Sequence, residues 1–528
     1  MPETCLRPRR IAMLLVLGAL VLLPGLGSAG RLTYHEAIWA QVAREMIASG
    51  DILIPTLDGR PWLEKPPLPI WLMAGAGALA GGVTEASARI PSAIAAALLA
   101  LGMATFAARR FGASIGQLSG AVQVTSAWVV MRGRLAEADV LLAALVVWSV
   151  VAFDRLRTDG PHRNAWRWAF FALMGTSSLV KGIGFGAVLV VAMIILTLAW
   201  DRDRPALKAL AHPGGWIMAA VLAIVWPVFV VVRYPSAFGL WAMHVADRLT
   251  PRSEHFVGEP WWLYTSSLFW QTLPWTPLAV VAMWPSLRRA IAQREGGDRL
   301  LWAWAVGPAV LVSLASARNA HYLIYALPPW SIWTAFGLAR LGDRLRWQRA
   351  FTPHRLRFAT CAGLSIVGLA YALGYAYLGP WFDRRGVEWG FYEVAGRSLP
   401  PGEPLALLYP TDYHRYPTPF GPVPHDLAVR LFYLNRPACW RIGLAALAKH
   451  PPAAPPTPFA VIARTQDLPA LRGLGQVELI AQEPATPRTD RAFALFQVRP
   501  FSAENGQDLA TEITENIETI QGHKRTKN

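Results

Sequence analysis

The chain has 528 residues, of which 54% are hydrophobic, 11% aromatic and only 16% charged. Soluble domains carry roughly 25% charged residues, and so many apolar residues exceed what one or two soluble cores would bury. Disorder, collagen-like repeats and a disulfide scaffold are excluded by the same composition, which includes only three cysteines. The 24 tryptophans are typical of side chains that line membrane–water interfaces. The sequence therefore predicts a polytopic membrane protein.

The charge pattern agrees with this prediction. The chain has 50 Lys and Arg against 34 Asp and Glu, a formal net charge of +16. The basic residues lie in short segments between apolar runs, where they fix the orientation of membrane helices. Membrane orientation accounts for the positive charge, so no nucleic-acid partner is expected.

Two apolar runs near the beginning of the chain need separate interpretations. The run 11–27 follows Arg7, Arg9 and Arg10 and is either a cleaved signal peptide or an uncleaved first span; we favour a span with a cytoplasmic N-terminus. The run 66–80 is short and begins with two prolines. We interpret it as an interfacial or re-entrant helix at the outer surface, because a span here would reverse the charge alternation of the later loops.

The remaining apolar runs are each close to the ~20 residues that a helix needs to cross the hydrocarbon. Every alternate connection between them is rich in arginine, which places these connections in the cytoplasm. The prediction is about 11 spans, or up to about 13 if one or two are missed, with the C-terminus outside. The expected spans are 88–108, 113–131, 139–153, 166–180, 183–200, 215–232, 263–284, 300–316, 322–339 and 357–378.

The composition changes after about residue 380. Short apolar runs at 405–408, 459–462 and 477–480 alternate with helical patterns, which predicts a small soluble α/β domain in the outer compartment. We therefore expect a transmembrane module over 1–380, with a first outer loop and its interfacial helices over 31–87. The α/β domain follows over 381–500, and a polar, disordered tail over 501–528. The fold class is a mainly α, polytopic membrane helical bundle with this added domain.

The outer loops carry motifs in a recognisable order. The first loop contains Glu36 to Ala40, then Ala43 to Met46, then Glu64 to Pro67. This series resembles the polyprenyl-phosphate-dependent glycosyltransferases of the GT-C fold, which include the lipid A aminoarabinose transferases and the protein O-mannosyltransferases. Further matches follow in order up to about residue 340: Asp139, Lys181-Gly182, 244–248 with 260–264, 273–275, and Tyr322 within 321–329.

The resemblance implies a sugar donor linked through phosphate to a polyprenyl chain in the bilayer, and transfer with inversion of the anomeric centre. Lys65, Lys181 and Arg248 are the expected cations that neutralise the departing phosphate. Contacts to substrate are expected from three more side chains: Glu64, Tyr322 and Arg318.

The general base is left open by a departure from the family pattern. The first carboxylate of the family, usually Asp, is His35 in this chain. The imidazole of His35 can accept a proton near neutral pH. Glu36 beside it and Asp139 are the other candidates for the catalytic base.

The implied function is sugar transfer to a lipid, glycan or protein acceptor on the outer face of a bacterial-type cytoplasmic membrane. A lipid-linked sugar flippase or transporter, and a scaffold of the same fold that has lost catalysis, are the alternatives. The partners are the polyprenyl-phosphate sugar, membrane lipids and the acceptor. No cofactor is implied, although a divalent metal site is an alternative at one set of residues: His244, Asp247, His255 and Glu259.

Overall fold

The structure is a computed structural model that divides into two compact units. Met1–Ala29 and Val42–Pro380 form one, the helical unit; Gly30–Gln41 and Trp381–Asn528 form the other, the sheet unit. Helix α2 (Tyr34–Ser49) therefore begins in the sheet unit and ends in the helical unit. The described residues are 6–28, 30–158, 162–249, 260, 262–293, 297–316, 318–347, 353–379, 385–413, 415–416, 423–452, 457–483 and 492–501.

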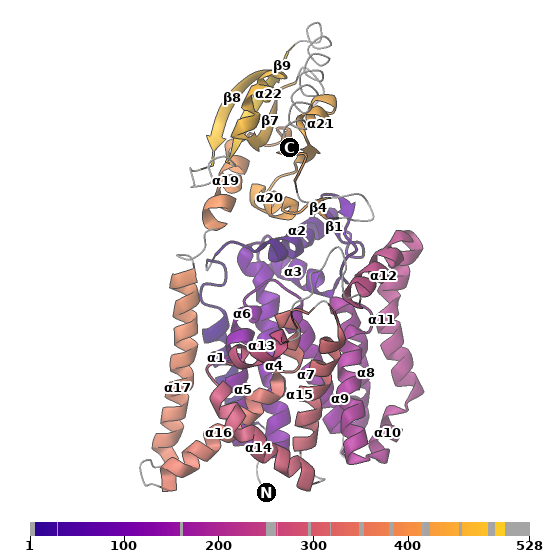
Figure 1. Ribbon diagram of the computed structural model, residues 1–528, viewed down its shortest axis with the longest axis vertical. Helices are drawn as coiled ribbons and strands as arrows, with labels where there is room; N and C mark the ends of the chain where they lie inside the picture. The colour runs from indigo at the N-terminus through magenta and orange to yellow at the C-terminus, as the bar shows by residue number, and fades with distance from the viewer. Residues whose placement is uncertain are drawn as a thin grey trace. The chain divides into compact units, whose positions relative to one another are not determined.

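The helical unit is built from long helices that pack side by side (Figure 1). A hairpin of two short antiparallel strands, β1 (Thr56–Leu57) and β2 (Arg60–Pro61), lies in the first loop. The helices are α1 (Pro8–Leu22), α3 (Leu68–Leu79), α4 (Glu85–Phe111), α5 (Ala113–Val124), α6 (Ala127–Gly133), α7 (Asp139–Leu156), α8 (Arg163–Lys181), α9 (Phe185–Asp201), α10 (Arg204–Leu210), α11 (Pro213–Arg233), α12 (Ser236–Leu249), α13 (Leu263–Gln271), α14 (Thr276–Ala292), α15 (Asp298–Leu314), η1 (Ala320–Tyr325), α16 (Pro328–Trp347), α17 (Pro353–Leu373) and η2 (Gly374–Leu378).

The apolar runs of the sequence correspond to helices of this unit. Two of the described helices, α4 and α11, are long and apolar enough to cross a membrane by themselves, and α3 and α9 are shorter apolar helices. With 12 residues, α3 is about 18 Å long, well short of the ~30 Å hydrocarbon core. The observed fold class of this unit is a helical bundle, while the count of 11–13 membrane spans stays a prediction.

Small residues bring neighbouring helices into close contact. Gly116 and Gly120 of α5 face α4. A Cβ added at Gly116 would lie 2.5 Å from the Cβ of Ala108, and one added at Gly120 would lie 2.9 Å from the Cβ of Ala104. This spacing of small residues lets helix backbones approach closely in a membrane, where packing rather than the hydrophobic effect holds helices together. The turn between the two helices passes through Gly112, whose φ of +93° favours glycine.

Three of the expected spans are interrupted by a break in the helix. The first break separates α5 from α6, where the hydroxyls of Thr125 and Ser126 donate to the carbonyls of Ala121 and Val122 and compete with the helical hydrogen bonds. Pro274 lies in the second break, between α13 and α14, and Pro328 follows the third break, between η1 and α16. Irregular backbone at membrane depth is tolerated only inside the protein or beside a cavity.

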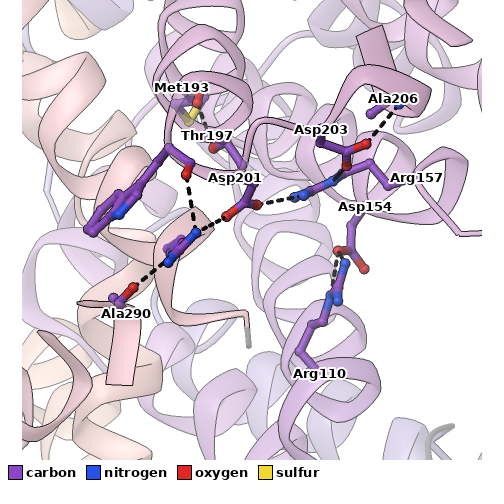
Figure 2. Close-up of polar contacts among 11 residues, drawn as sticks. Arg110, Asp154, Arg157, Met193, Thr197, Asp201, Asp203, Ala206 and Ala290 are labelled. Carbon is purple, nitrogen blue, oxygen red and sulfur yellow. Dashed lines mark hydrogen bonds and ion pairs between the residues drawn. The ribbon is translucent and has the colours of Figure 1, made fainter. Parts of the chain in front are cut away.

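Ion pairs between helix ends hold together one end of the helical unit, which we call the arginine end. Figure 2 shows Asp201 and Asp203 turned toward Arg157. Asp154 and Asp201 each pair with two arginines, and Arg157 pairs with two carboxylates, so most of these pairs form networks rather than isolated bridges. The pairs are Arg109–Asp154, Arg110–Asp154, Arg157–Asp201, Arg157–Asp203, Arg299–Asp201 and Arg289–Asp298.

The sheet unit contains a mixed five-stranded sheet in the order β6-β3-β7-β9-β8. β3 pairs in parallel with β6 and β7, and β9 pairs antiparallel with β7 and β8. Every residue of β3 is buried, as expected for a central parallel strand covered on both faces. The elements are β3 (Leu405–Tyr409), β4 (Arg415–Tyr416), β5 (Val423–Pro424), β6 (Cys439–Ile442), β7 (Phe459–Arg464), β8 (Gly475–Gln482), β9 (Phe493–Pro500), α19 (Arg385–Ser398), α20 (Leu427–Leu434), α21 (Leu444–Lys449), η3 (Thr465–Asp467) and α22 (Leu468–Arg472).

The predicted strands at 405–408, 459–462 and 477–480 correspond to β3, β7 and β8. The domain boundaries at 380 and 500 stay predictions, and the expected tail lies outside the described residues apart from Phe501.

Candidate active site

Asp139 is the centre of a buried cluster of charged and aromatic side chains in the helical unit. It is the first residue of α7 and is only 6% exposed. Its carboxylate accepts hydrogen bonds from Nη2 of Arg132 at 2.7 Å and from the hydroxyl of Tyr325 at 3.0 Å, and it forms an ion pair with Lys181. Arg132 also pairs with Glu137. Two cations thus balance two carboxylates.

Aromatic rings enclose the ammonium group of Lys181. Nζ lies 4.5 Å from the ring centre of Tyr322, 5.8 Å from that of Phe185 and 5.9 Å from that of Tyr325. These distances are within the range of cation–π attraction. Lys181 is the last residue of α8, and Gly182 follows with a φ of +134°. The chain therefore turns directly after the lysine and leaves its side chain at the helix end.

The broken helices explain why this cluster forms. Tyr322 and Tyr325 belong to η1, which contacts α7, α13 and α15. Gln271, at the end of α13, donates from Nε2 to the carbonyl of Ala320 at 2.8 Å. Between the α5–α6 break and the α13–α14 break, the Ala127 amide donates to the Leu273 carbonyl at 2.9 Å. The interruptions therefore contact one another and place short, irregular segments beside the first turn of α7.

The cluster and the arginine end lie at opposite ends of α7. Asp139 begins this helix and Asp154, which pairs with Arg110, lies in its last turn. A helix of 18 residues is about 27 Å long at 1.5 Å per residue. In Figure 1, α3 and β1 lie at one end of the helical unit and α10 at the other.

The loop that carries Glu64 and Lys65 is fixed by indole N–H groups. Trp241 of α12 donates to the carbonyl of Leu63 at 2.7 Å, and Trp226 of α11 donates to that of Leu53 at 2.8 Å. Burial raises the pKa of the Glu64 carboxyl, and the neighbouring ammonium of Lys65 opposes this rise. Glu64 is thus an acid whose proton is retained to higher pH than usual.

The carboxylate of Glu45 shapes the same loop. It accepts hydrogen bonds from the Thr56 hydroxyl at 3.0 Å and from the amides of Asp58 and Gly59 at 2.9 and 3.1 Å. These contacts close the β1–β2 hairpin onto α2. The family-like segment 43–46 therefore includes a carboxylate with a structural role in this chain.

His35 and Glu36 belong to the sheet unit and lie in the first turn of α2. Thr33 and Glu36 form reciprocal contacts: the Thr33 amide donates to Oε2 of Glu36 at 2.8 Å, and the Glu36 amide donates to Oγ1 of Thr33 at 3.3 Å. This arrangement is a capping box. Glu36 is fully buried, so its carboxylate contributes to the start of the helix whatever its role in chemistry.

The other predicted site residues are placed as follows. Lys181, Asp139 and Tyr322 come together, so Lys181 is already paired with a carboxylate in this structure. Nε of Arg318 donates to the carbonyl of Ser313 at 3.4 Å. The side chain of Arg248 lies outside the described residues. In the part of the chain that the structure describes, no group of His, Cys, Asp or Glu is arranged to hold a metal ion. Of the four alternative metal ligands, only His244 has a described side chain.

Arg132 and Tyr325 are the contacts of Asp139 that the sequence analysis missed. Arg132 lies between the apolar run 113–131 and Asp139, in a short connection that the expected topology places on the outer side of the bundle. A cation on that side is an exception to the charge rule and points to a functional or paired role. Tyr325 is only three residues after Tyr322, which is the spacing that places both rings on one side of a 3₁₀ helix.

This arrangement suits the binding of an anion in dry surroundings. Arg132 and Lys181 approach one carboxylate from two different elements, and both are fixed by further contacts. Hydrogen bonds between charged groups are strengthened where water is scarce. An incoming phosphate could exchange for the carboxylate as the partner of either cation, which would release Asp139 to accept a proton.

Comparisons with known proteins confirm the resemblance that the loop motifs predicted. A family model described as dolichyl-phosphate-mannose-protein mannosyltransferase matches residues 64–230. The undecaprenyl phosphate-alpha-4-amino-4-deoxy-L-arabinose arabinosyl transferase of Aeromonas salmonicida (strain A449) is 27% identical over 305 residues, 56% of this chain and 53% of the relative. Its counterpart 2 in Pseudomonas fluorescens (strain Pf0-1) is 26% identical over 385 residues, 69% of this chain and 66% of the relative. The chain thus spans between half and two thirds of these relatives' length.

Solved structures share the fold over most of the chain. The crystal structure of ArnT from Cupriavidus metallidurans bound to undecaprenyl phosphate has a TM-score of 0.72 and 19% identity, covering 92% of this chain and 97% of that one. The archaeal oligosaccharyltransferase AglB from Archaeoglobus fulgidus has a TM-score of 0.52 and 13% identity, covering 81% and 64%. The chain therefore has the helical membrane fold of the GT-C glycosyltransferases.

Proposed function

We propose that this protein is a membrane glycosyltransferase that moves a sugar from a polyprenyl-phosphate donor to an acceptor hydroxyl on a lipid, glycan or protein. The relatives in sequence are named as undecaprenyl phosphate-aminoarabinose transferases, and the solved ArnT contains undecaprenyl phosphate. The observation that carries the proposal is the Asp139 cluster. It combines a buried carboxylate with two cations and two tyrosines at the end of α7 remote from the arginine end.

In the proposed reaction, the acceptor oxygen attacks the anomeric carbon of the donor sugar. The bond from that carbon to the phosphate oxygen breaks, polyprenyl phosphate leaves, and the acceptor proton passes to a base. Inversion at the anomeric carbon follows from attack opposite the leaving group. Lys65, Lys181 and Arg248 supply the positive charge that the leaving phosphate needs. For Lys181, the ion pair with Asp139 keeps the ammonium in place before the donor arrives.

The base is proposed to be His35, Glu36 or Asp139. Asp139 is the candidate whose environment couples directly to phosphate binding, since the cations that hold it are suited to bind the phosphate. Glu64, Tyr322 and Arg318 are proposed to contact the substrate. For Tyr322, support comes from its ring against Lys181, where it would border a phosphate bound to that ammonium.

The proposed topology places the arginine end in the cytoplasm and the Asp139 cluster at the outer side of a bacterial-type cytoplasmic membrane. The bundle then has about 11–13 spans, α3 lies at the outer interface, and residues 381–500 form an extracytoplasmic domain. A reporter fused after residue 380 should be active only outside the cytoplasm. A cytoplasmic signal there would overturn this topology.

Purified protein in sealed proteoliposomes, supplied with a polyprenyl phosphate bearing a radiolabelled sugar and with an outer-membrane lipid extract, tests the function. Transfer of the label to an acceptor, with release of polyprenyl phosphate, is the expected result. Movement of the labelled donor across the membrane without any product would support a flippase instead. Binding of the donor, with no sugar transfer to any class of acceptor, would identify a scaffold that has lost catalysis.

A further inference from the structure

The segment Gly30–Gln41 folds with the sheet unit although it follows α1 in the sequence. It contains both candidate bases that the first loop supplies, His35 and Glu36. The capping box fixes Glu36 relative to Thr33, but that contact is local. The orientation of the segment as a whole depends on what the rest of the sheet unit provides.

Residues before α2 are tied to helices α19 and α20 by three different kinds of contact. Nη2 of Arg31 forms an ion pair with Oε2 of Glu393 at 2.6 Å, and the guanidinium lies 5.0 Å from the ring centre of Tyr433. The amide of Leu32 donates to the hydroxyl of Tyr433 at 2.7 Å, a buried hydrogen bond. A backbone hydrogen bond to a buried hydroxyl fixes the chain and not merely a side chain.

An aromatic stack extends these contacts to the candidate base. The rings of Tyr34 and His425 are parallel, with centroids 3.6 Å apart and an angle of 9° between the planes. Tyr34 also meets the ring of His35 edge to face, with centroids 5.4 Å apart. His425 therefore stacks on the residue whose ring meets the imidazole of His35.

The surface that receives the segment is itself held firmly. The side chain of Arg430, in α20, is 2% exposed; it pairs with Asp426 at 2.9 Å and lies 4.4 Å from the ring of Tyr409 and 4.3 Å from that of Phe493. A buried charge in such a position needs all of its partners. Because Asp426 directly follows His425, and Tyr433 lies on the same short helix as Arg430, the cage around Arg430 fixes both contacts of the segment.

We propose that the C-terminal domain is a positioning element for catalysis, in which Tyr433 and His425 orient the His35–Glu36 turn through Leu32 and Tyr34. This inference rests on the proposed function and adds a role for the domain in that reaction. His425 and Tyr433 act through other residues, so they are positioning residues rather than catalytic ones. Small displacements of reacting groups lower turnover by about 10²-fold, which sets the effect to look for.

Hydrogen exchange tests the docking without any need for activity. In the purified full-length protein, Tyr433→Phe removes the acceptor of the Leu32 amide but keeps the ring under Arg31, and His425→Ala removes the stack on Tyr34. Exchange in a peptide covering residues 31–37 should rise in both variants. The matched control is Glu478→Ala in the same unit, where an exposed pair with Arg499 at 4.0 Å is lost. Unchanged exchange in both test variants would overturn the proposal.

Transfer kinetics test the positioning role. His425→Ala should lower turnover per folded molecule by about 10- to 100-fold without a matching rise in the KM for the donor, since the ring contact concerns the His35 turn. His425→Phe, which keeps a ring for stacking, should restore most of the turnover, whereas a loss of folded protein alone would leave turnover per folded molecule unchanged. Raised exchange with unchanged turnover overturns the positioning role. If wild-type protein transfers no sugar, the proposed function fails, while the exchange result still decides whether the docking exists.

Discussion

The pair Asp139–Lys181 should show strong energetic coupling when its two charges are removed singly and together. Asp139→Asn keeps the shape of the side chain but removes the charge that faces Lys181 and Arg132. Lys181→Met keeps the length of the lysine and removes its charge. Asp139→Asn leaves the buried ammonium of Lys181 without its carboxylate, and Lys181→Met leaves Asp139 with Arg132 as its remaining ion-pair partner, whereas the double variant leaves Arg132 paired with Glu137.

The expected magnitude follows from the burial of the pair, in which the two side chains are 10% and 9% exposed. Removing one partner of a buried ion pair costs about 3–5 kcal/mol, and replacing both charges often costs little. Each single variant should therefore lower the free energy of unfolding by about 3–5 kcal/mol. The double variant should cost clearly less than the sum of the two, so the coupling free energy should amount to several kcal/mol.

The assay is equilibrium unfolding in mixed micelles, followed by tryptophan fluorescence, for the wild type and the three variants. The exposed pair Arg499–Glu478 gives a matched control, because its side chains are 66% and 72% exposed. Its double-mutant cycle should yield a coupling of at most about 1 kcal/mol. Additive costs at Asp139 and Lys181, with no coupling beyond that of the control pair, would refute the geometry from which the cluster is argued.

Three further predictions concern single residues of the site. Lys65→Ala should lower the rate of transfer at limiting donor by about ten- to a hundred-fold, the value of one charge-assisted contact to a buried phosphate. An unchanged rate at limiting donor would contradict a phosphate contact. If His35 is the base, turnover should rise with pH near ~6.5 and His35→Asp should move that limb down toward ~4; identical pH–rate profiles for both proteins would remove His35 from the reaction. Burial raises the pKa of Glu64 above its ordinary 4.5, so the protonated form favours the folded state and this stabilisation is lost as the pH rises through the raised pKa. Glu64→Gln should therefore match the wild type in thermal unfolding midpoint in acid and exceed it at neutral pH, and an equal difference at both pH values would be inconsistent with that shift.

The positions of most helices could be predicted because each apolar run is about as long as a bilayer is thick. The run 139–153 corresponds to α7 (Asp139–Leu156), and the run 215–232 corresponds to α11 (Pro213–Arg233). The break after Val124 was not predicted. It depends on hydroxyl groups at Thr125 and Ser126, which are compatible with a continuous helix in the sequence and interrupt it only through their hydrogen bonds to the preceding turn.

The site was predicted as a set of residues but not as an arrangement. Asp139 and Lys181 were identified from motifs, while their pairing joins positions 42 residues apart and depends on how α7 packs against α8. Tyr325 reaches the same carboxylate from 186 residues away because η1 contacts α7. Likewise, the motif around Glu36 was assigned to an outer loop of the membrane module. Its association with Tyr433, 401 residues beyond Leu32, is a tertiary contact that no local pattern encodes.

The most direct test of sugar transfer at the Asp139 cluster is a stoichiometry measurement on purified protein in nanodiscs. A polyprenyl phosphate carrying a radiolabelled sugar is supplied with acceptor lipid, and released polyprenyl phosphate and labelled product are counted over time for the wild type and Asp139→Asn. The wild type should form product and free polyprenyl phosphate in equal amounts, and Asp139→Asn, after correction for folded protein, should lose about 10²-fold or more in rate. Equal rates for the two proteins, or donor cleavage without labelled product, would contradict the account.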